Sequence, residues 1–207
     1  MIRRYFPASL NVRKKSCLVI GADAEASEKA LRLLESGAQV TIITHGPSAA
    51  LLSAAREKGA VILERPFSTE DVADQFLVTL AIKTDPALTR LVAERCRARR
   101  VLICAIDEPD FCDFAHVSLL EKGPLQISIS TDGRAPALAR RIREDLDRSF
   151  SAQPVEAFVE HLSRLRDRLE REVPDLPERR KQLIAAAAGF ALRVDVTFPD
   201  GWTEKGA

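Results

Sequence analysis

The stretch from Lys15 to Thr44 places the strongest constraint on how this chain can fold. Residues 16–20 form a short apolar run with β propensity, and residues 26–36 carry apolar side chains at helical spacing. Gly37 then stands where a helix C-cap favours a residue that tolerates positive φ, and residues 39–44 supply a second strand. This order predicts a right-handed βαβ crossover, whose first turn directs backbone N–H groups toward an anion.

The turn of this unit keeps only part of the glycine pattern of dinucleotide-binding folds. A complete fingerprint has three glycines; here Gly21 is kept, Asp23 takes the second position and Ala26 the third. An aspartate near a pyrophosphate is unfavourable, by roughly 3 kcal/mol for unit charges about 5 Å apart at an effective dielectric near 20. The alternative is an α/β unit that binds no dinucleotide.

Strands and helices continue to alternate through the first half of the chain. Further strands are predicted over residues 60–64, 76–82 and 101–106, with helices over residues 48–58 and 86–99. This alternation predicts an α/β fold with an open parallel sheet of the Rossmann type.

The second half has a different character. Residues 111–120 are short and mixed, residues 125–130 alternate apolar and polar side chains, and residues 135–150 return to helical periodicity. From Pro154 onward the pattern is helical, with an apolar stripe from Val155 to Leu169 and a second helix expected over residues 178–192.

Composition excludes several classes of protein. The 207 residues are 46% hydrophobic, which supports a real core, and the formal charge of +1 gives no general attraction to nucleic acid or membrane. No apolar run approaches the ~20 residues that cross a bilayer. The N-terminus lacks the apolar core of a signal peptide, so we expect a cytoplasmic protein.

No C-x-x-C pair is present, which argues against structural zinc, and four free thiols are expected: Cys17, Cys96, Cys104 and Cys112.

Ligands of open α/β sheets bind at the carboxyl ends of the strands, and candidate residues collect there. They are the turn from Gly21 to Glu25, the turn around His45 and Gly46, and Asp107. Asp107 directly follows a buried strand, so its carboxylate could take a proton from a substrate or hold a metal. The alternative is a turn or helix-capping aspartate, which such positions often host.

Two further features are weaker candidates. His116 could be a ligand or base, but a histidine without an acidic or thiol partner at ligand spacing is more often structural. The segment from Ser130 to Pro136 precedes a helix, and its hydroxyls and amides could cap that helix or hold an acidic substrate group. Positive charge lies nearby on Arg134, Arg140, Arg141 and Arg143.

A set of short motifs in a shared order points to one family. They are Tyr5-Phe6-Pro7, Cys17 to Gly21, Leu33 to Ala38, Arg65-Pro66-Phe67, Asp85 to Leu88, Ile106 to Pro109, Cys112-Asp113-Phe114, Pro124-Leu125 and Leu138 to Arg140. In these motifs and their order, residues 3–150 resemble the precorrin-2 dehydrogenase/sirohydrochlorin ferrochelatase family. Members of this family are the stand-alone enzyme or the N-terminal module of sirohaem synthesis. Within the resemblance, Ala22-Asp23 stand where the family usually has Gly-Gly, and Lys83-Thr84 where it has Thr-Asp.

The resemblance implies an enzyme that uses NAD to oxidise precorrin-2 to sirohydrochlorin, followed in bifunctional members by insertion of Fe²⁺. It implies an NAD-binding Rossmann-type domain over residues 1–113, a small α+β dimerisation segment over 114–150 that joins a homodimer, and a helical C-terminal domain over 151–207. The alternative is a relative without redox activity that binds a tetrapyrrole or acts only as a chelatase.

The resemblance also assigns residues to the site. Asp107 falls on the catalytic aspartate, and Thr131 falls on a hydroxyl residue of the tetrapyrrole crevice. Apart from the resemblance, His116 is a second expected substrate contact. NAD-contacting positions of the family fall on Ala24, Glu25, His45 and Gly46. Together with Gly21, Ala22 and Asp23 of the turn after the first strand, these are the expected cofactor-binding residues.

Overall fold

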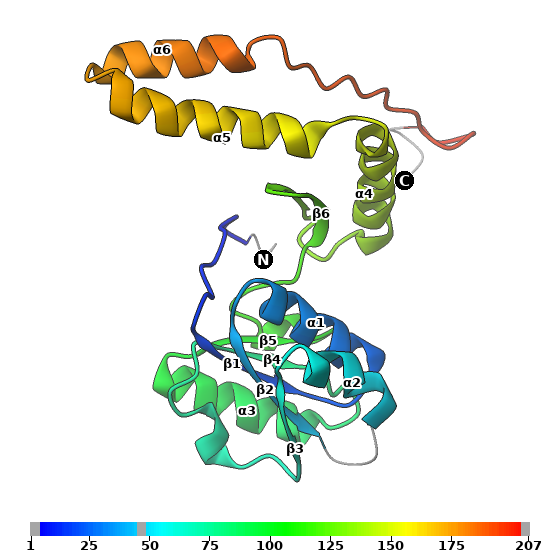
Figure 1. The fold of residues 1–207 in the computed structure, drawn as a ribbon. Helices are drawn as coiled ribbons and strands as arrows, with labels where there is room; N and C mark the ends of the chain where they lie inside the picture. Colours follow the sequence, from blue (N-terminus) through cyan, green and yellow to red (C-terminus); the bar gives the residue numbers. More distant parts are fainter. Residues whose placement is uncertain (1–4, 45–48, 204–207) are drawn as a thin grey trace. The chain divides into compact units, whose positions relative to one another are not determined.

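The computed structural model describes residues 5–44 and 49–203 (Figure 1). They belong to two compact units. The first comprises Met1–Val117 and Asp132–Ala135, and the second comprises Ser118–Thr131 and Pro136–Ala207.

A five-stranded parallel sheet forms the centre of the first unit. In spatial order, its strands are β3 (Val61–Glu64), β2 (Gln39–Thr44), β1 (Ser16–Ile20), β4 (Leu77–Leu80) and β5 (Leu102–Ala105). All neighbouring pairs are parallel, so the carboxyl ends of the strands lie along one edge of the sheet. The predicted Rossmann-type sheet is confirmed.

Helices cover both faces of this sheet (Figure 1). α1 (Ala24–Glu35) and α2 (Ala49–Glu57) contact each other and share one apolar core with the sheet. α3 (Pro86–Arg99) contributes to the second core, together with the 3-10 turn Thr69–Val72. The predicted helix over residues 86–99 is confirmed.

The central strand β1 shows why its sequence is apolar throughout. Cys17 and Val19 belong to the core beneath α1 and α2, whereas Leu18 and Ile20 belong to the core beneath α3. All four residues are 1% exposed or less. A parallel strand covered on both faces has no solvent-facing positions, and its sequence therefore does not alternate.

Side chains at the helix starts satisfy backbone groups that the helices leave without partners. Asp23 accepts a hydrogen bond from the backbone N–H of Ala26 at 2.8 Å, and Asp85 accepts one from Leu88 at 2.9 Å. Gly37 follows α1 with a φ of +81°, as its expected C-cap position requires. The bounds of α1 and α3 thus follow from local sequence.

An antiparallel hairpin and three helices make up the second unit. The hairpin pairs β6 (Ser118–Lys122) with β7 (Leu125–Ile129), and the helices are α4 (Pro136–Ser151), α5 (Val155–Glu172) and α6 (Leu176–Ala187). α5 and α6 lie side by side (Figure 1). The core of this unit is formed by Leu120, Phe150 and Val155.

Two elements of the second unit differ from the expectation. The short and mixed stretch 111–120 contains the start of β6, because pairing with β7 provides backbone hydrogen bonds that its own pattern does not reveal. The helix expected over residues 178–192 is present, but it spans Leu176–Ala187, so its end comes earlier than expected. Pro177 lies in its first turn, where a missing N–H costs no helical hydrogen bond.

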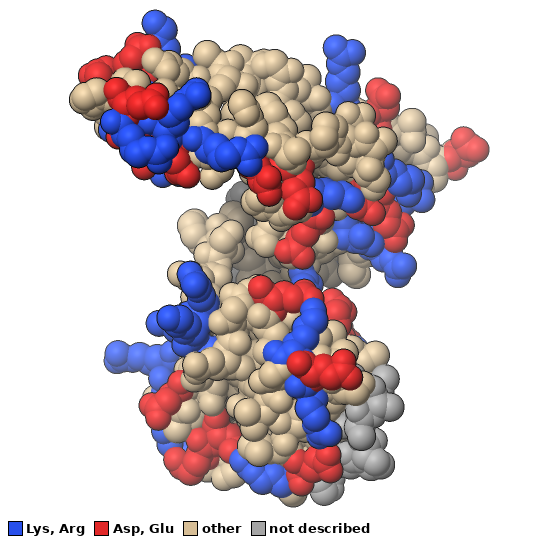
Figure 2. Space-filling model, in the orientation of Figure 1, with Lys and Arg blue, Asp and Glu red and all other residues tan. Residues whose placement is uncertain are grey.

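Charged side chains of both signs are interspersed over the face of the molecule shown in Figure 2. This mixture agrees with the formal net charge of +1. Within the described ranges, no helix is long and apolar enough to span a bilayer.

Candidate functional site

The turn between β1 and α1 is shaped so that backbone segments can approach each other closely. Gly21 directly follows β1 and has a φ of +151°, a conformation that side chains strongly disfavour. A Cβ atom placed on Gly21 would lie 3.0 Å from the Cβ of Ala81, which follows β4, and 3.1 Å from the Cβ of Ala26 in α1. The glycine therefore keeps the β1–α1 turn tight against the carboxyl end of β4, the position that a dinucleotide fold requires.

The other residues of this turn determine what the start of α1 offers to an anion. Asp23 directs its carboxylate to the N–H of Ala26, so one donor is occupied by the protein itself. Ala24 and Glu25 are the first two helical residues, and helix geometry gives their N–H groups no intrahelical acceptor. A pyrophosphate can therefore still find two amide donors here, although it would lie beside the carboxylate of Asp23.

Asp107 lies two residues beyond β5, at the same edge of the sheet. Its backbone is in the left-handed region with a φ of +63°, and its side chain is 69% exposed. The carboxylate atom Oδ2 lies 2.6 Å from Nζ of Lys83, which follows β4. The carboxylate is thus accessible at the rim of the sheet, where a proton-accepting group would meet a substrate.

Lys83 joins Asp107 to the start of α1, where cofactor binding is predicted. Its Nζ also lies 2.9 Å from Oε2 of Glu25 in the first turn of α1. The hydrogen bonds to Asp107 and Glu25 raise the pKa of the Lys83 ammonium group above its ordinary value, so this group stays charged. One cation therefore bridges two carboxylates from different elements of the site.

Sequence reasoning did not identify Lys83 as a site residue. The signal was its position three residues after the buried strand β4, combined with a strand order that places β4 between β1 and β5. Residues that follow three adjacent parallel strands must meet at one edge, and Glu25, Lys83 and Asp107 do so.

His116 lies beside β4. Its Nε2 is 3.3 Å from Oγ1 of Thr79, which is fully buried, and its ring packs edge-on against Phe114 with 5.5 Å between ring centres. Burial is the main cause that lowers the pKa of His116 to about 3, and the positive charges of Lys29 and Arg32 add to it. A neutral histidine packed in this way fits a structural role, and substrate contact by His116 stays a prediction.

The remaining predicted residues are distributed as follows. Thr131 belongs to the second unit, where it follows β7 and is half-buried. His45 and Gly46 lie outside the described residues. Their predicted roles stay predictions.

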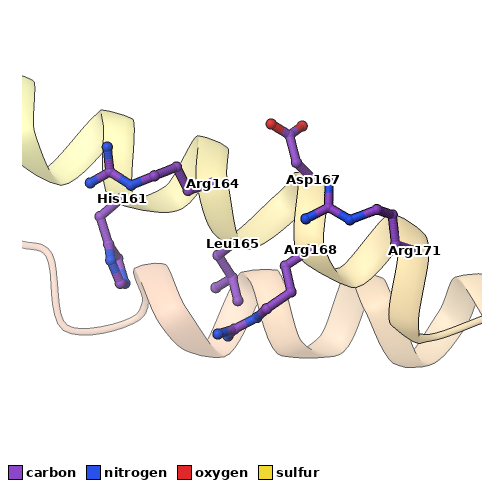
Figure 3. A pocket seen from close by; sticks show the side chains of 6 residues that line it. All are labelled: His161, Arg164, Leu165, Asp167, Arg168 and Arg171. Atoms are coloured by element: carbon purple, nitrogen blue, oxygen red, sulfur yellow. The ribbon is translucent and has the colours of Figure 1, made fainter.

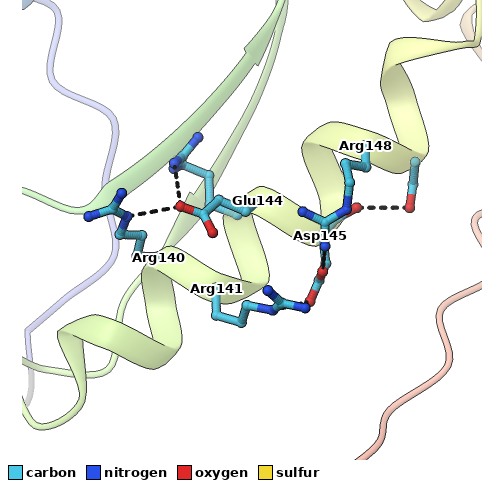
Figure 4. Close-up of polar contacts among 7 residues, drawn as sticks. Arg140, Arg141, Glu144, Asp145 and Arg148 are labelled. Atoms are coloured by element: carbon cyan, nitrogen blue, oxygen red, sulfur yellow. Dashed lines mark hydrogen bonds and ion pairs between the residues drawn. The ribbon is translucent and has the colours of Figure 1, made fainter.

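The arginines near residue 140 pair mainly along their own helix (Figure 4). Arg140 Nε lies 2.9 Å from Oε1 of Glu144, and Arg141 Nε lies 3.3 Å from Oδ2 of Asp145, which also pairs with Arg148. These are the four-residue and three-residue spacings at which neighbours meet on a helix surface. Arg140, Arg141 and Arg143 therefore each pair with an acidic residue of α4.

A hollow of about 460 Å³ lies along α5 (Figure 3). Every side chain that lines it comes from this one helix, and Arg164 and Arg168 also pair with acidic residues of α5. It has the character of a solvated helix face.

The residues that the structure describes contain no group of three or more His, Cys, Asp and Glu side chains that could hold a metal ion.

Two family models match this chain. A family model described as "Putative NAD(P)-binding" matches residues 8–118, and one described as "Sirohaem biosynthesis protein central" matches residues 122–149. The chain is 31% identical over 177 residues to a sirohaem synthase of Neisseria meningitidis serogroup C, covering 86% of this chain and 36% of that protein. A sirohaem synthase of Salmonella schwarzengrund is 29% identical over 179 residues, with 86% and 38% covered.

Among solved structures, SirC, a precorrin-2 dehydrogenase, superimposes with a TM-score of 0.73. The two chains are 21% identical, and the match covers 87% of this chain and 88% of the other. This likeness establishes a shared fold. The chain spans little more than a third of the length of the curated relatives it matches.

Proposed function

This chain belongs to the putative NAD(P)-binding family, and on that premise and its match to a sirohaem biosynthesis model we propose that it oxidises precorrin-2 to sirohydrochlorin with NAD⁺ as the hydride acceptor. The observation that carries the proposal is the position of Asp107. Its exposed carboxylate stands at the same sheet edge as the Gly21 turn and is linked to Glu25 of that turn through Lys83. This arrangement supports a proton acceptor beside the turn that would bind the cofactor.

NAD⁺, when bound, supplies a two-electron acceptor for hydride. The chain provides the remaining functions. The N–H groups of Ala24 and Glu25 would hold the pyrophosphate at the start of α1, and Gly21 keeps the turn close enough for this contact. Asp107 would accept the proton that the macrocycle loses as hydride leaves, so that two hydrogens depart in total, one as hydride and one as a proton.

The direct test is anaerobic incubation of the purified protein with precorrin-2 and NAD⁺, followed by the absorbance of sirohydrochlorin. We expect product from the wild type and a loss of at least about a hundredfold in rate for Asp107→Asn, the lower range for removal of a general base. A wild type that forms no product would contradict the proposal.

The chain offers a matched control for this substitution. Asp74 has a φ of +60°, close to that of Asp107, and it is exposed, but it precedes β4 and so lies toward the amino ends of the strands. Asp74→Asn makes the same chemical change in the same backbone conformation. We expect it to leave the oxidation rate within about twofold, because it lies away from the carboxyl-end rim.

Three further parts of the proposal rest on the family. Insertion of Fe²⁺ into sirohydrochlorin would be a second reaction, tested by adding Fe²⁺ after the oxidation is complete and following the absorbance of the metallated product. A homodimer joined through residues 114–150 would be tested by analytical ultracentrifugation. A cytoplasmic location would be tested by cell fractionation.

A further inference from the structure

The rim of the sheet carries more negative charge than a dinucleotide site favours. Asp23 and Glu25 come from the β1–α1 turn, and Asp107 follows β5. A dinucleotide brings a pyrophosphate with two negative charges to the start of α1, where these carboxylates would repel it. Some feature of the site has to offset this repulsion if the cofactor is to bind.

Lys83 is placed to provide that offset. Its Nζ lies 2.6 Å from Asp107 Oδ2 and 2.9 Å from Glu25 Oε2, so one ammonium group contacts both carboxylates. The Lys83 side chain is 44% exposed, and that of Glu25 is 31% exposed. The cation is therefore close enough to the surface to act on an incoming ligand, and it is held in place from both sides.

We propose that Lys83 sets the affinity of this site for NAD⁺ by neutralising Glu25 and Asp107, so that the pyrophosphate can approach the start of α1. This inference rests on the proposed function, since it assumes that NAD⁺ binds at the Gly21 turn. It assigns a cofactor-affinity role to a residue that the glycine fingerprint does not include. Lys83 acts here through charge, and a substitution that restores the charge balance by another route should restore binding.

The test measures NAD⁺ binding by isothermal titration calorimetry at low ionic strength, without substrate. We expect Lys83→Met to weaken binding about tenfold or more, because two carboxylates lose their cation. Lys83→Arg should stay within about threefold of the wild type, since it keeps the charge. The difference in NAD⁺ affinity between Lys83→Met and the wild type should become smaller in about 1 M salt, where exposed charges are screened.

A second-site variant separates charge from structure. Adding Glu25→Gln to Lys83→Met removes one carboxylate together with the cation, so most of the lost affinity should return. If Lys83 only held the fold together, the double variant would bind no better than the single one. That result would overturn the inference.

A matched control is Lys58→Met in the same unit. Lys58 pairs with Glu35, at the last residue of α1, and its side chain is half exposed, as that of Lys83 is. Its removal should leave the NAD⁺ affinity unchanged. A wild type that binds no NAD⁺ would overturn the proposed cofactor and this inference together, whereas a binding wild type with an equally tight Lys83→Met variant would overturn this inference alone.

Discussion

The carboxylate of Asp23 accepts a hydrogen bond from the backbone N–H of Ala26 at 2.8 Å, three residues further along the chain. The aspartate at the second glycine position of the fingerprint is therefore the N-cap of α1. Its negative charge lies at the positive end of the helix dipole, where it stabilises the free protein and competes with a bound phosphate for the same helix end.

Substitutions of Asp23 should separate these two effects. Asp23→Asn keeps a side-chain oxygen for the cap and removes the charge, so the free energy of unfolding should fall by less than about 0.5 kcal/mol. NAD⁺ binding should tighten, by up to about a hundredfold at low salt. Asp23→Ala loses the cap and should cost about 1 kcal/mol. Urea unfolding and titration calorimetry measure the two quantities, and an unchanged affinity in Asp23→Asn would show that this charge does not reach the phosphates.

Gly21→Ala should destabilise the first unit by roughly 2–4 kcal/mol. The new methyl group meets Ala81 and Ala26 at about 3 Å, and the backbone conformation is itself strained for alanine. Gly59→Ala is the matched control, because Gly59 also has positive φ but nothing lies within 4 Å of the place that a new methyl group would take. Its cost should be about 1 kcal/mol. Equal losses in chemical denaturation would show that packing at Gly21 is unimportant.

His116 should make stability depend on pH. Because burial lowers the pKa of His116 in the folded protein to about 3, against about 6.5 in an unfolded chain, only the unfolded state binds this proton between those values. Above pH 6.5 His116 is neutral in both states and does not lower the free energy of unfolding. As the pH falls from 6.5 toward 3, proton binding to the unfolded state lowers the free energy of unfolding by up to about 1.4 kcal/mol per pH unit.

His116→Gln removes this proton-binding group and keeps a polar side chain beside Thr79. Denaturant unfolding at several pH values between 7 and 4 should show a shallower fall in the unfolding free energy than in the wild type. The same slope in both proteins would contradict the buried neutral histidine.

The four thiols should react at different rates. Burial raises the pKa of Cys17 to about 11 and that of Cys96 to about 12, which leaves little thiolate at pH 8. Cys112 is half-buried, with its Sγ 3.9 Å from that of the buried Cys104. N-ethylmaleimide followed by peptide mass spectrometry should label Cys112 first, and Cys17 and Cys96 only after unfolding. Early labelling of Cys17 would contradict its burial in β1.

Local sequence was sufficient wherever local physics decides the structure. The apolar run of β1, the capping aspartate before α3 and Gly37 after α1 each mark an element through its own side chains and backbone preferences. The expectation failed at β6, whose pairing depends on β7, and at the end of α6.

The sequence by itself therefore determined the βαβ order, the parallel sheet and the placement of Asp107 just after a buried strand. Only the tertiary structure decided that Lys83 contacts both Glu25 and Asp107, that Asp23 points to its own helix, and that His116 is packed beside Thr79. The physical reason is that these contacts act through space. Residues 25, 83 and 107 meet because β1, β4 and β5 are neighbours in the sheet, and that neighbourhood is created by long-range packing of strands whose own patterns are alike.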